Sequence, residues 1–196
     1  MHIKHFAAAL ALAAFANAGN AAVLLTTSGS AANIVTDYSA PGAVSFDLDL
    51  VNFEATTLRF TLEAGDLSGP LSLNAIVRNL SGTALNQFHF RLNGISFATP
   101  GSVTPTFGTL GELKSGPDYA SIAFATPEFA EFHFGNPFGL NSASNWLFDT
   151  RGLNVGDSFV ISAEVPEPST LALMLPILCL AGMMRSRRAK TFMTDR

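Results

Sequence analysis

Between two apolar stretches at its ends, the chain alternates hydrophobic and polar residues with a period of two. The clearest case is the segment 44–50, whose hydrophobic members are Val44, Phe46, Leu48 and Leu50. The same alternation occurs in four further segments: 58–63, 88–92, 132–134 and 159–162. Successive side chains of a β-strand point to opposite faces of a sheet, so this period is typical of strands that are buried on one side only. No segment between the two ends has a clear helical period.

Turn-forming pairs separate these segments. Examples are Ser81-Gly82, Asn93-Gly94 and Gly156-Asp157, and pairs of this kind favour tight turns. The pattern predicts an all-β domain, an antiparallel β-sandwich, over residues 23–165. The segments 75–92 and 153–159 resemble strands of immunoglobulin-like extracellular modules. This resemblance implies an immunoglobulin-like fold but no particular function.

The N-terminal residues 1–22 have the features of a secretory signal peptide. Lys4 gives a basic start, and an apolar run follows from Phe6 to Phe15. Two small-residue sites come next, 16–18 and 19–21. A basic start, a short apolar run and a small-residue cleavage site predict export, with the mature chain beginning between Gly19 and Val23.

The C-terminal residues 166–190 predict a membrane anchor. A motif of Pro166, Glu167 and Pro168 precedes an apolar run of about 14 residues, which predicts a single transmembrane helix over about residues 170–184. A basic cluster ends the segment: Arg185, Arg187 and Arg188. Because basic residues stay on the cytoplasmic side, the tail would hold residues 23–165 outside the inner membrane.

These three parts, in this order, closely resemble the PEP-CTERM sorting tail. The resemblance covers about the last 30 residues, and the chain departs from the family pattern only in extending to Arg196 beyond the arginines. It implies that an exosortase-type membrane enzyme processes the tail near Pro166-Glu167-Pro168. It also implies a transient stay in the inner membrane, a final place at the cell surface or in the matrix, and an association with exopolysaccharide.

Charge and cysteine content exclude some functions. Between Ala22 and Val165 there are five basic and thirteen acidic residues, a net charge of −8. An acidic domain repels phosphate, so nucleic acid is not an expected partner. The one cysteine, Cys179, lies in the C-terminal apolar run, so neither an intrachain disulfide nor a zinc site of several thiolates can form.

No motif of a known catalytic type occurs in the chain. The segment 94–98 contains a serine after a glycine, as in a hydrolase nucleophile turn, but it lacks the closing glycine. There is also no phosphate-binding glycine loop followed by lysine and no zinc-protease helix motif. The sequence therefore predicts a protein that is not an enzyme, with no catalytic residue, no metal and no cofactor.

Two polar pairs are weaker candidates for a site. Asp47 and Asp49 share one strand face, about 7 Å apart, where they would bind a cation or sugar hydroxyls or simply face solvent. His89 and His133 each lie between two phenylalanines and should point away from them. If their strands are neighbours, they make half of a metal site, and otherwise they are exposed polar positions.

Two further groups concern catalysis and sugar binding. Glu128 and Glu131 fall on opposite faces of an extended segment, which argues against a catalytic pair. Phe138, Trp146 and Phe148 would make a sugar-stacking platform if they were exposed, whereas core packing is the ordinary role of such residues.

Three functions follow from these observations. The first is a structural or interaction protein of the cell surface or extracellular matrix, sorted by an exosortase-like system. The second is a carbohydrate-binding module in the same location, which requires an exposed aromatic side chain beside polar ones. The third is a secreted hydrolase, which requires convergent carboxylates or a nucleophile beside a base. The absence of a strong catalytic motif favours the first.

Overall fold

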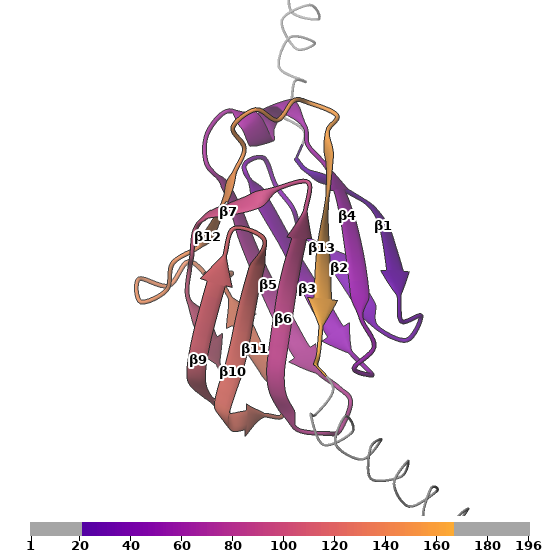
Figure 1. Ribbon diagram of the computed structural model, residues 1–196, viewed down its shortest axis with the longest axis vertical. Coiled ribbons are helices and arrows are strands. Elements are labelled where there is room, and N and C mark those ends of the chain that lie inside the picture. Colours follow the sequence, from indigo (N-terminus) through magenta and orange to yellow (C-terminus); the bar gives the residue numbers. More distant parts are fainter. Residues whose placement is uncertain (1–20, 167–196) are drawn as a thin grey trace, which may run out of the picture. The chain divides into compact units, whose positions relative to one another are not determined.

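The alternating segments form two β-sheets, one in front of the other in Figure 1. The computed structural model describes residues 21–166, apart from the side chain of Thr26. The front sheet has six strands in the order β1 (Val23–Gly29), β4 (Thr56–Thr61), β13 (Ser158–Glu164), β6 (Leu85–Asn93), β10 (Tyr119–Glu128) and β9 (Thr109–Gly116). In the figure they run from β1 on the right to β9 on the left.

The second sheet has seven strands. Its main path is β2 (Ile34–Asp37), β3 (Ala43–Leu50), β5 (Leu71–Asn79), β11 (Glu131–Phe134) and β8 (Val103–Pro105). The strand β12 (Trp146–Asp149) pairs with β5 and with β7 (Ser96–Thr99). Because β11 pairs with residues 75–78 of β5 and β12 with residues 71–73, these two short strands share one edge of β5.

One pairing within the described residues departs from the antiparallel prediction. Strands β3 and β5 run parallel, with Ala43 opposite Ser72 and Leu50 opposite Asn79. A parallel pair needs a connection that carries the chain back to its starting end. Here β4 provides that return, because it lies between β3 and β5 in the sequence but belongs to the other sheet.

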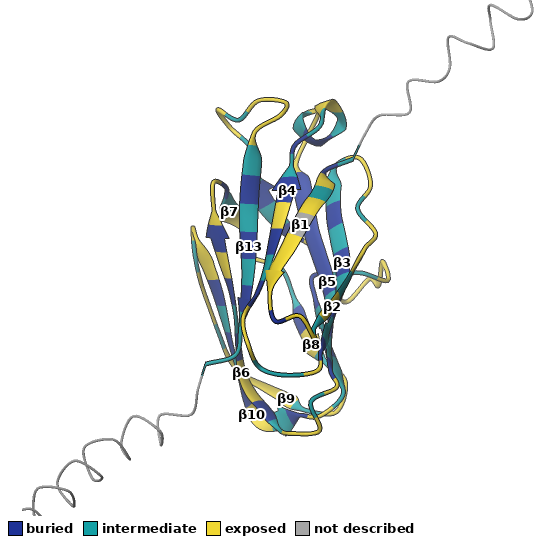
Figure 2. Ribbon diagram, turned by 90° about the vertical axis from the view of Figure 1, so that its right-hand side faces the viewer, coloured by how far each residue is buried: buried dark blue, intermediate teal, exposed yellow. Residues whose placement is uncertain are grey.

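Aromatic side chains from both sheets meet in the core. Figure 2 shows the alternation of buried and less buried residues along the strands. Phe88 of β6 contacts Phe132 of β11 with ring centroids 5.2 Å apart, and Phe90 contacts Phe134 at 4.8 Å. Both pairs are edge-on, the arrangement that the charge distribution of aromatic rings favours. These contacts join the sheets face to face, as in a sandwich.

The all-β prediction is confirmed, and the alternating residues are buried as expected. The hydrophobic members of the segments 44–50, 58–62, 88–92 and 132–134 all belong to the core, and so do Phe159 and Ile161 of the last segment. Between Ala21 and Pro166 the structure contains one short 3-10 helix, η1 (Ala64–Leu67), and no α-helix. The acidic side chain of Asp66 in this turn is buried and accepts hydrogen bonds from the N–H groups of Gly42 and Glu63.

The predicted targeting segments lie almost entirely outside the described residues. Pro166 is the last described residue of the sorting motif, and the five others lie beyond it: Glu167, Pro168, Arg185, Arg187 and Arg188. The predicted transmembrane helix over about residues 170–184 also lies there. Over the described part of the chain, no helix has the length and apolar character that crossing a membrane requires. At the N-terminal end, Ala22 is buried against the core.

Candidate functional site

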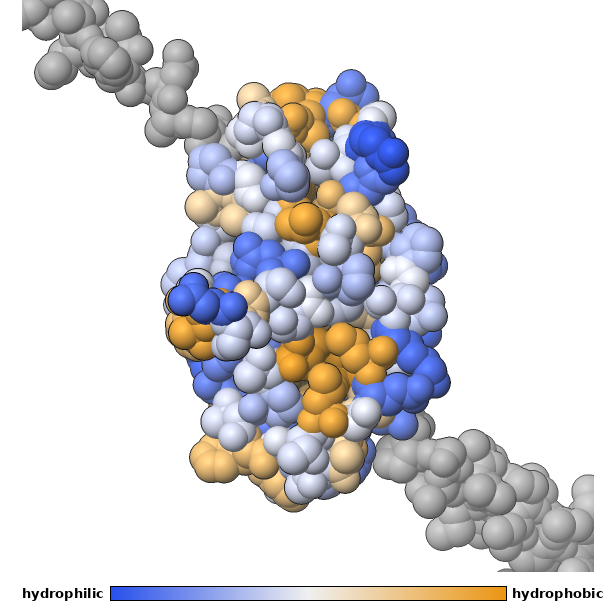
Figure 3. All heavy atoms as spheres, turned by 90° about the vertical axis from the view of Figure 1, so that its left-hand side faces the viewer, coloured by the Kyte–Doolittle hydropathy of each residue, from blue (hydrophilic) through white to orange (hydrophobic). Residues whose placement is uncertain are grey.

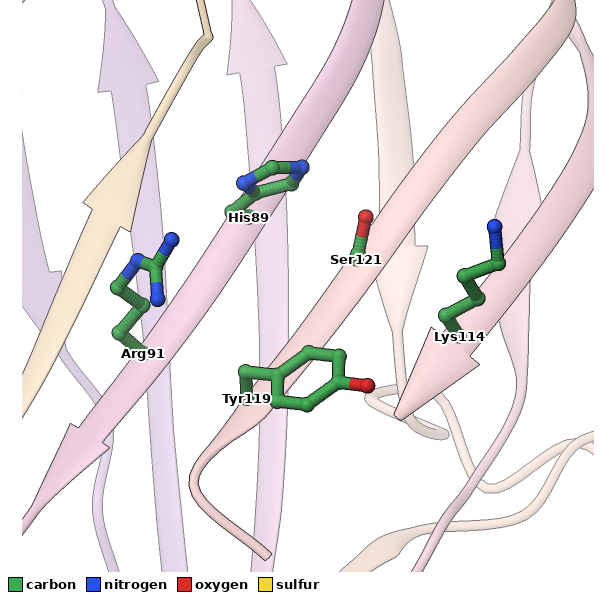
Figure 4. A pocket seen from close by; sticks show the side chains of 5 residues that line it. All are labelled: His89, Arg91, Lys114, Tyr119 and Ser121. Carbon is green, nitrogen blue, oxygen red and sulfur yellow. The ribbon is translucent and has the colours of Figure 1, made fainter. Parts of the chain in front are cut away.

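The outward side of the six-stranded sheet contains a hollow of about 270 Å³ over β6, β10 and β9. Five side chains line it: His89, Arg91, Lys114, Tyr119 and Ser121. Figure 4 shows Arg91 and Lys114 at opposite sides of the hollow, with Tyr119 and Ser121 between them. The lining residues of β6 and β10 alternate with buried residues of the same strand, so the core positions of these two strands determine which side chains point outward.

Strand register arranges these side chains in two rows across the sheet. In one row, Glu164 lies opposite His89, His89 opposite Ser121, and Ser121 opposite Lys114. In the neighbouring row, Arg91 lies opposite Tyr119, and Tyr119 opposite Gly116. Directly opposed residues on one face of a sheet have Cβ atoms about 5 Å apart, so members of each row can bind the same ligand.

The ring of Tyr119 lies over Gly116 of the edge strand β9. A Cβ atom at Gly116 would stand 2.4 Å from Cε1 of the ring, a distance that no side chain can occupy. The glycine therefore makes room for the ring to lie against the β9 backbone. Tyr119 remains 38% exposed, so the ring offers a supported aromatic surface to a ligand.

The charges on this side of the sheet differ from those of the domain as a whole. Arg91 Nε lies 3.0 Å from Glu164 Oε2, and Lys114 Nζ lies 2.9 Å from Glu112 Oε2. The exposed Arg59 of β4 points to the same side, because its neighbours Leu58 and Phe60 point into the core. Three of the five basic residues between Ala22 and Val165 thus face outward from this sheet.

His89 is uncharged at neutral pH. Its partial burial lowers the pKa of the imidazole below the ordinary value of 6.5, and the charge of Arg91 on the same strand lowers it further. The carboxylate of Glu164 on β13 acts in the opposite direction and only partly compensates. At pH 7 the imidazole is therefore a neutral hydrogen-bonding group in the hollow, and it gains a positive charge in mild acid.

The row that contains Ser121, His89 and Glu164 has the residue types of a hydrolase triad. The geometry is not that of a triad, because the carboxylate of Glu164 accepts a hydrogen bond from Arg91 Nε. Within residues 21–166, no hydrogen bond joins Ser121 to His89 or His89 to Glu164. Nucleophilic catalysis by serine needs both of those bonds.

Asp47 and Asp49 bind an arginine of the neighbouring strand on the outer side of the seven-stranded sheet. Arg78 of β5 donates to Asp47 Oδ2, and its Nη1 lies 2.7 Å from Asp49 Oδ1. Glu131 of β11 is a third carboxylate near the same guanidinium, with its Oε2 3.7 Å from Arg78 Nε. The two aspartates do share a face, as expected, but Arg78 occupies the place that was considered for a cation or a sugar.

The two histidines lie on opposite outer sides of the sandwich. His89 belongs to the six-stranded sheet and His133 to the seven-stranded sheet, and each points away from its flanking core phenylalanines. The condition for a shared metal site, that their strands are neighbours, is therefore not met. Instead, His133 Nε2 lies 3.3 Å from Glu131 Oε1, and the imidazole contacts the ring of Phe138 edge-on.

The three aromatic residues considered for a sugar platform do not lie together on the surface. Trp146 and Phe148 are buried, and Trp146 stacks on Phe134 with ring centroids 4.4 Å apart. Phe138 alone is exposed. Of the two alternatives considered, core packing therefore holds for Trp146 and Phe148, because β12 pairs with β5 and turns both side chains into the core.

Glu128 is a fully buried carboxylate that fixes a loop. Its Oε2 accepts the backbone N–H groups of residues 106, 107 and 108 at 2.8–3.0 Å, and its Oε1 accepts that of Ala130 at 2.9 Å. Burial alone would raise the pKa of this carboxyl, but the four N–H bonds together bring it below the ordinary value of 4.5. Glu131 begins the next strand and forms an ion pair with Arg78 at 3.7 Å, so the two glutamates do not form a catalytic pair.

Exposed hydrophobic side chains occur away from the hollow. Figure 3, which views the molecule from the side of β9, shows such side chains in several areas, the broadest of which is bordered by polar side chains. The most exposed large hydrophobic residue of the described chain is Phe107, in the loop that Glu128 holds, and Phe129 follows Glu128 directly. Both are side chains that the sequence pattern did not single out.

The sequence contained a signal for the hollow that the search for motifs missed. Ala120, Ile122 and Phe124 are buried and alternate with Tyr119 and Ser121, a strand pattern like the five noted above. Lys114 lies on the exposed edge strand β9, where alternation is weak because both sides of the strand are largely open to solvent. Only the register of β6, β10 and β9 brings the lining residues together.

Comparison of the chain with protein-family models, with curated proteins and with solved structures finds no match.

Proposed function

We propose that residues 23–165 form an immunoglobulin-like binding module of the cell surface or extracellular matrix, and that its ligand is a carbohydrate. The module is not an enzyme. An exosortase-type enzyme of the inner membrane processes its C-terminal tail, and the module then stays at the cell surface or in the matrix. Exopolysaccharide is its partner there.

The single observation that carries the binding proposal is the Tyr119 ring supported by Gly116 in the hollow. Sugars bind proteins through an apolar ring face and a rim of hydroxyl groups. The hollow offers an aromatic surface for the first and the side chains of His89, Arg91 and Ser121 for the second. This is the exposed aromatic side chain beside polar ones that a carbohydrate-binding module requires.

A hydrolase is the weaker proposal for the same hollow. The order of Ser121, His89 and Glu164 across the sheet favours it. The ion pair of Glu164 with Arg91 opposes it, because a catalytic histidine must be oriented by a carboxylate.

Binding is tested with the full chain, purified in a non-ionic detergent, on an array of immobilised polysaccharides. We expect retention on at least one polysaccharide, and loss of that retention in Tyr119→Ala. Phe138→Ala is the matched control, because it removes an exposed aromatic ring from the opposite side of the sandwich. Equal retention of Tyr119→Ala and the unaltered chain would refute the assignment of the site.

The location is tested by fractionation of cells that express the full chain or a chain without residues 171–188. The truncated chain should be released as a soluble exported protein, because burial of the apolar run 171–184 favours the membrane by several kcal/mol on an insertion scale (about 0.5 per leucine). Glu167→Ala should insert normally and be processed more slowly. Truncated protein that still fractionates with inner membranes would show that the tail is not the anchor.

A further inference from the structure

The hollow combines one supported aromatic ring with cationic groups at two opposite sides (Figure 4). Arg91 belongs to β6 and Lys114 to β9, and β10 lies between these strands. Adjacent strands lie about 4.8 Å apart, and Lys114 lies two residues, about 7 Å, along β9 from Gly116, which is in the row of Arg91. The two cations are therefore anchored about 12 Å apart, with Tyr119 on the strand between them. This separation is about the length of a disaccharide.

The donor groups of Arg91 are only partly used within the domain. Its Nε donates to Glu164, and over residues 21–166 its two Nη groups donate to no protein acceptor. Those Nη groups are two parallel donors, the geometry that binds both oxygens of a carboxylate. Lys114 has a flexible stem, is paired with Glu112 of its own exposed strand, and has three donors.

The distribution of charge distinguishes the side of the domain that carries this hollow from the rest of the domain. The domain carries a net charge of −8 and repels a polyanion at long range. The outward side of the six-stranded sheet counteracts this repulsion. It carries three basic side chains and only two carboxylates paired with them: Arg59, Arg91 and Lys114, against Glu112 and Glu164. On the opposite side of the sandwich, three carboxylates surround the single Arg78.

We propose that the hollow binds a carboxylated polysaccharide. One sugar ring stacks on Tyr119, and carboxylates of that ring and of the next one pair with Arg91 and Lys114. This inference rests on the function proposed above, because it names the class of carbohydrate that the same hollow takes. Neutral glycans should bind less tightly, since their hydroxyl oxygens are uncharged acceptors for Arg91 and Lys114, whereas a carboxylate is a charged one.

The test compares two polymers with the same sugar backbone: polygalacturonate, which carries carboxylates, and its fully methyl-esterified form, which carries uncharged esters. Binding of each to the full chain in non-ionic detergent is measured by titration calorimetry at low salt and in 0.5 M sodium chloride. We expect polygalacturonate to bind at least tenfold more tightly than the ester. We also expect high salt to remove most of this preference, because the pairing groups are exposed and a higher ionic strength screens them.

Variants locate the binding. Arg91→Gln and Lys114→Gln should each weaken polygalacturonate binding about tenfold, the effect of losing one charge-assisted hydrogen bond. Arg151→Gln is the matched control, because Arg151 lies in an exposed loop and pairs with Asp149. It removes the same charge and should change binding less than twofold.

The ring is tested separately from the charges. Gly116→Ala keeps every charge but places a methyl group where the Tyr119 ring lies, so it should displace the ring and weaken binding as Tyr119→Ala does. Fluorescence of Trp146, the one tryptophan of the chain, shows whether each variant is folded. If Tyr119→Ala is unfolded, Tyr119→Leu takes its place. If Arg91→Gln is unfolded, Arg91→Lys takes its place.

The outcomes separate this inference from the proposed function. If the ester and polygalacturonate bind equally, and Tyr119→Ala abolishes the binding of both, the ligand is not specifically a carboxylated polysaccharide. The proposal that the hollow binds carbohydrate would still stand. Binding of polyglutamate as tight as that of polygalacturonate would overturn the role of the sugar ring. Failure to bind any polysaccharide of the array would overturn both proposals.

Discussion

Replacing Glu128 with glutamine tests whether one buried carboxylate holds the loop at residues 106–108. Glutamine has nearly the shape of glutamate but only one acceptor oxygen. If that oxygen keeps the three N–H groups of the loop, the amide NH₂ faces the N–H of Ala130, and two donors then meet in a buried place. The variant loses one hydrogen bond to a charged acceptor and weakens the other three.

The expected cost follows from these contacts. A hydrogen bond to a charged group contributes about 1.5–3 kcal/mol, and a buried donor without an acceptor costs about 1–3 kcal/mol. We expect Glu128→Gln to lower the free energy of unfolding by about 3 kcal/mol. Glu128→Ala should cost still more, because it removes all four acceptor contacts.

Urea denaturation followed by Trp146 fluorescence measures this loss in the full chain. The ring is buried against Phe134 and becomes exposed on unfolding, so its emission reports on the sandwich alone. With a slope of about 2 kcal/mol per molar urea, the midpoint should fall by about 1.5 M. Glu112→Gln is the control, because this exposed glutamate pairs only with Lys114 and should shift the midpoint little.

The pH dependence of the same loss identifies its cause. The pKa of Glu128 is lowered by folding, so its contribution is fully present above the ordinary value of 4.5 and is lost as the pH falls through the lower folded value. The gap between the unaltered chain and Glu128→Gln should be constant from pH 7 to about 4.5 and narrow below. A midpoint for Glu128→Gln within 0.2 M of the unaltered chain at pH 7 would refute the reasoning.

Three further predictions concern other parts of the chain. Because Ala22 is buried in the core, the mature protein should begin at or before this residue, and an intact mass that starts at Val23 or later would contradict this. Polygalacturonate binding should tighten only as the pH falls below 6.5, because burial and Arg91 lower the pKa of His89 from that value and the imidazole gains its positive charge in more acidic solution; calorimetry of His89→Gln should show no such change, and an identical change there would exclude this cause. Arg78→Leu should lower the free energy of unfolding by about 1–2 kcal/mol at pH 7, since it leaves three carboxylates without their cation; urea titration measures this loss, and an unchanged midpoint would contradict the explanation.

Sequence reasoning found the core of the fold because hydrophobic alternation is a local signal. The segments 44–50 and 88–92 carry it without interruption, and both form strands with the expected side buried. The parallel pairing of β3 with β5 left no such signal, because it depends on β4 joining the other sheet. The choice between core packing and exposure for Trp146 stayed open for the same reason, since pairing with β5 and not local pattern decides which way β12 faces.

The candidate site was harder to find because its residues are distant in sequence and individually unremarkable in type. His89 and Ser121 become neighbours through the pairing of β6 with β10, and Lys114 joins them through β9. Gly116 gives the least obvious signal of all. A glycine at the end of a strand usually indicates a turn, yet here it makes room for the ring of Tyr119.

The two outer sides of the sandwich differ in how their cations are paired, and this difference is the reason to place binding on one of them. On the seven-stranded sheet, Arg78 has three carboxylates within 4 Å, so its donors are satisfied and its removal affects stability. On the six-stranded sheet, Arg91 has one carboxylate partner at the edge of its guanidinium, and a hollow lies on its other side. A ligand carboxylate can bind there without breaking the ion pair to Glu164. Substitution of Arg91 should therefore affect binding and leave the free energy of unfolding nearly unchanged, whereas substitution of Arg78 should do the reverse.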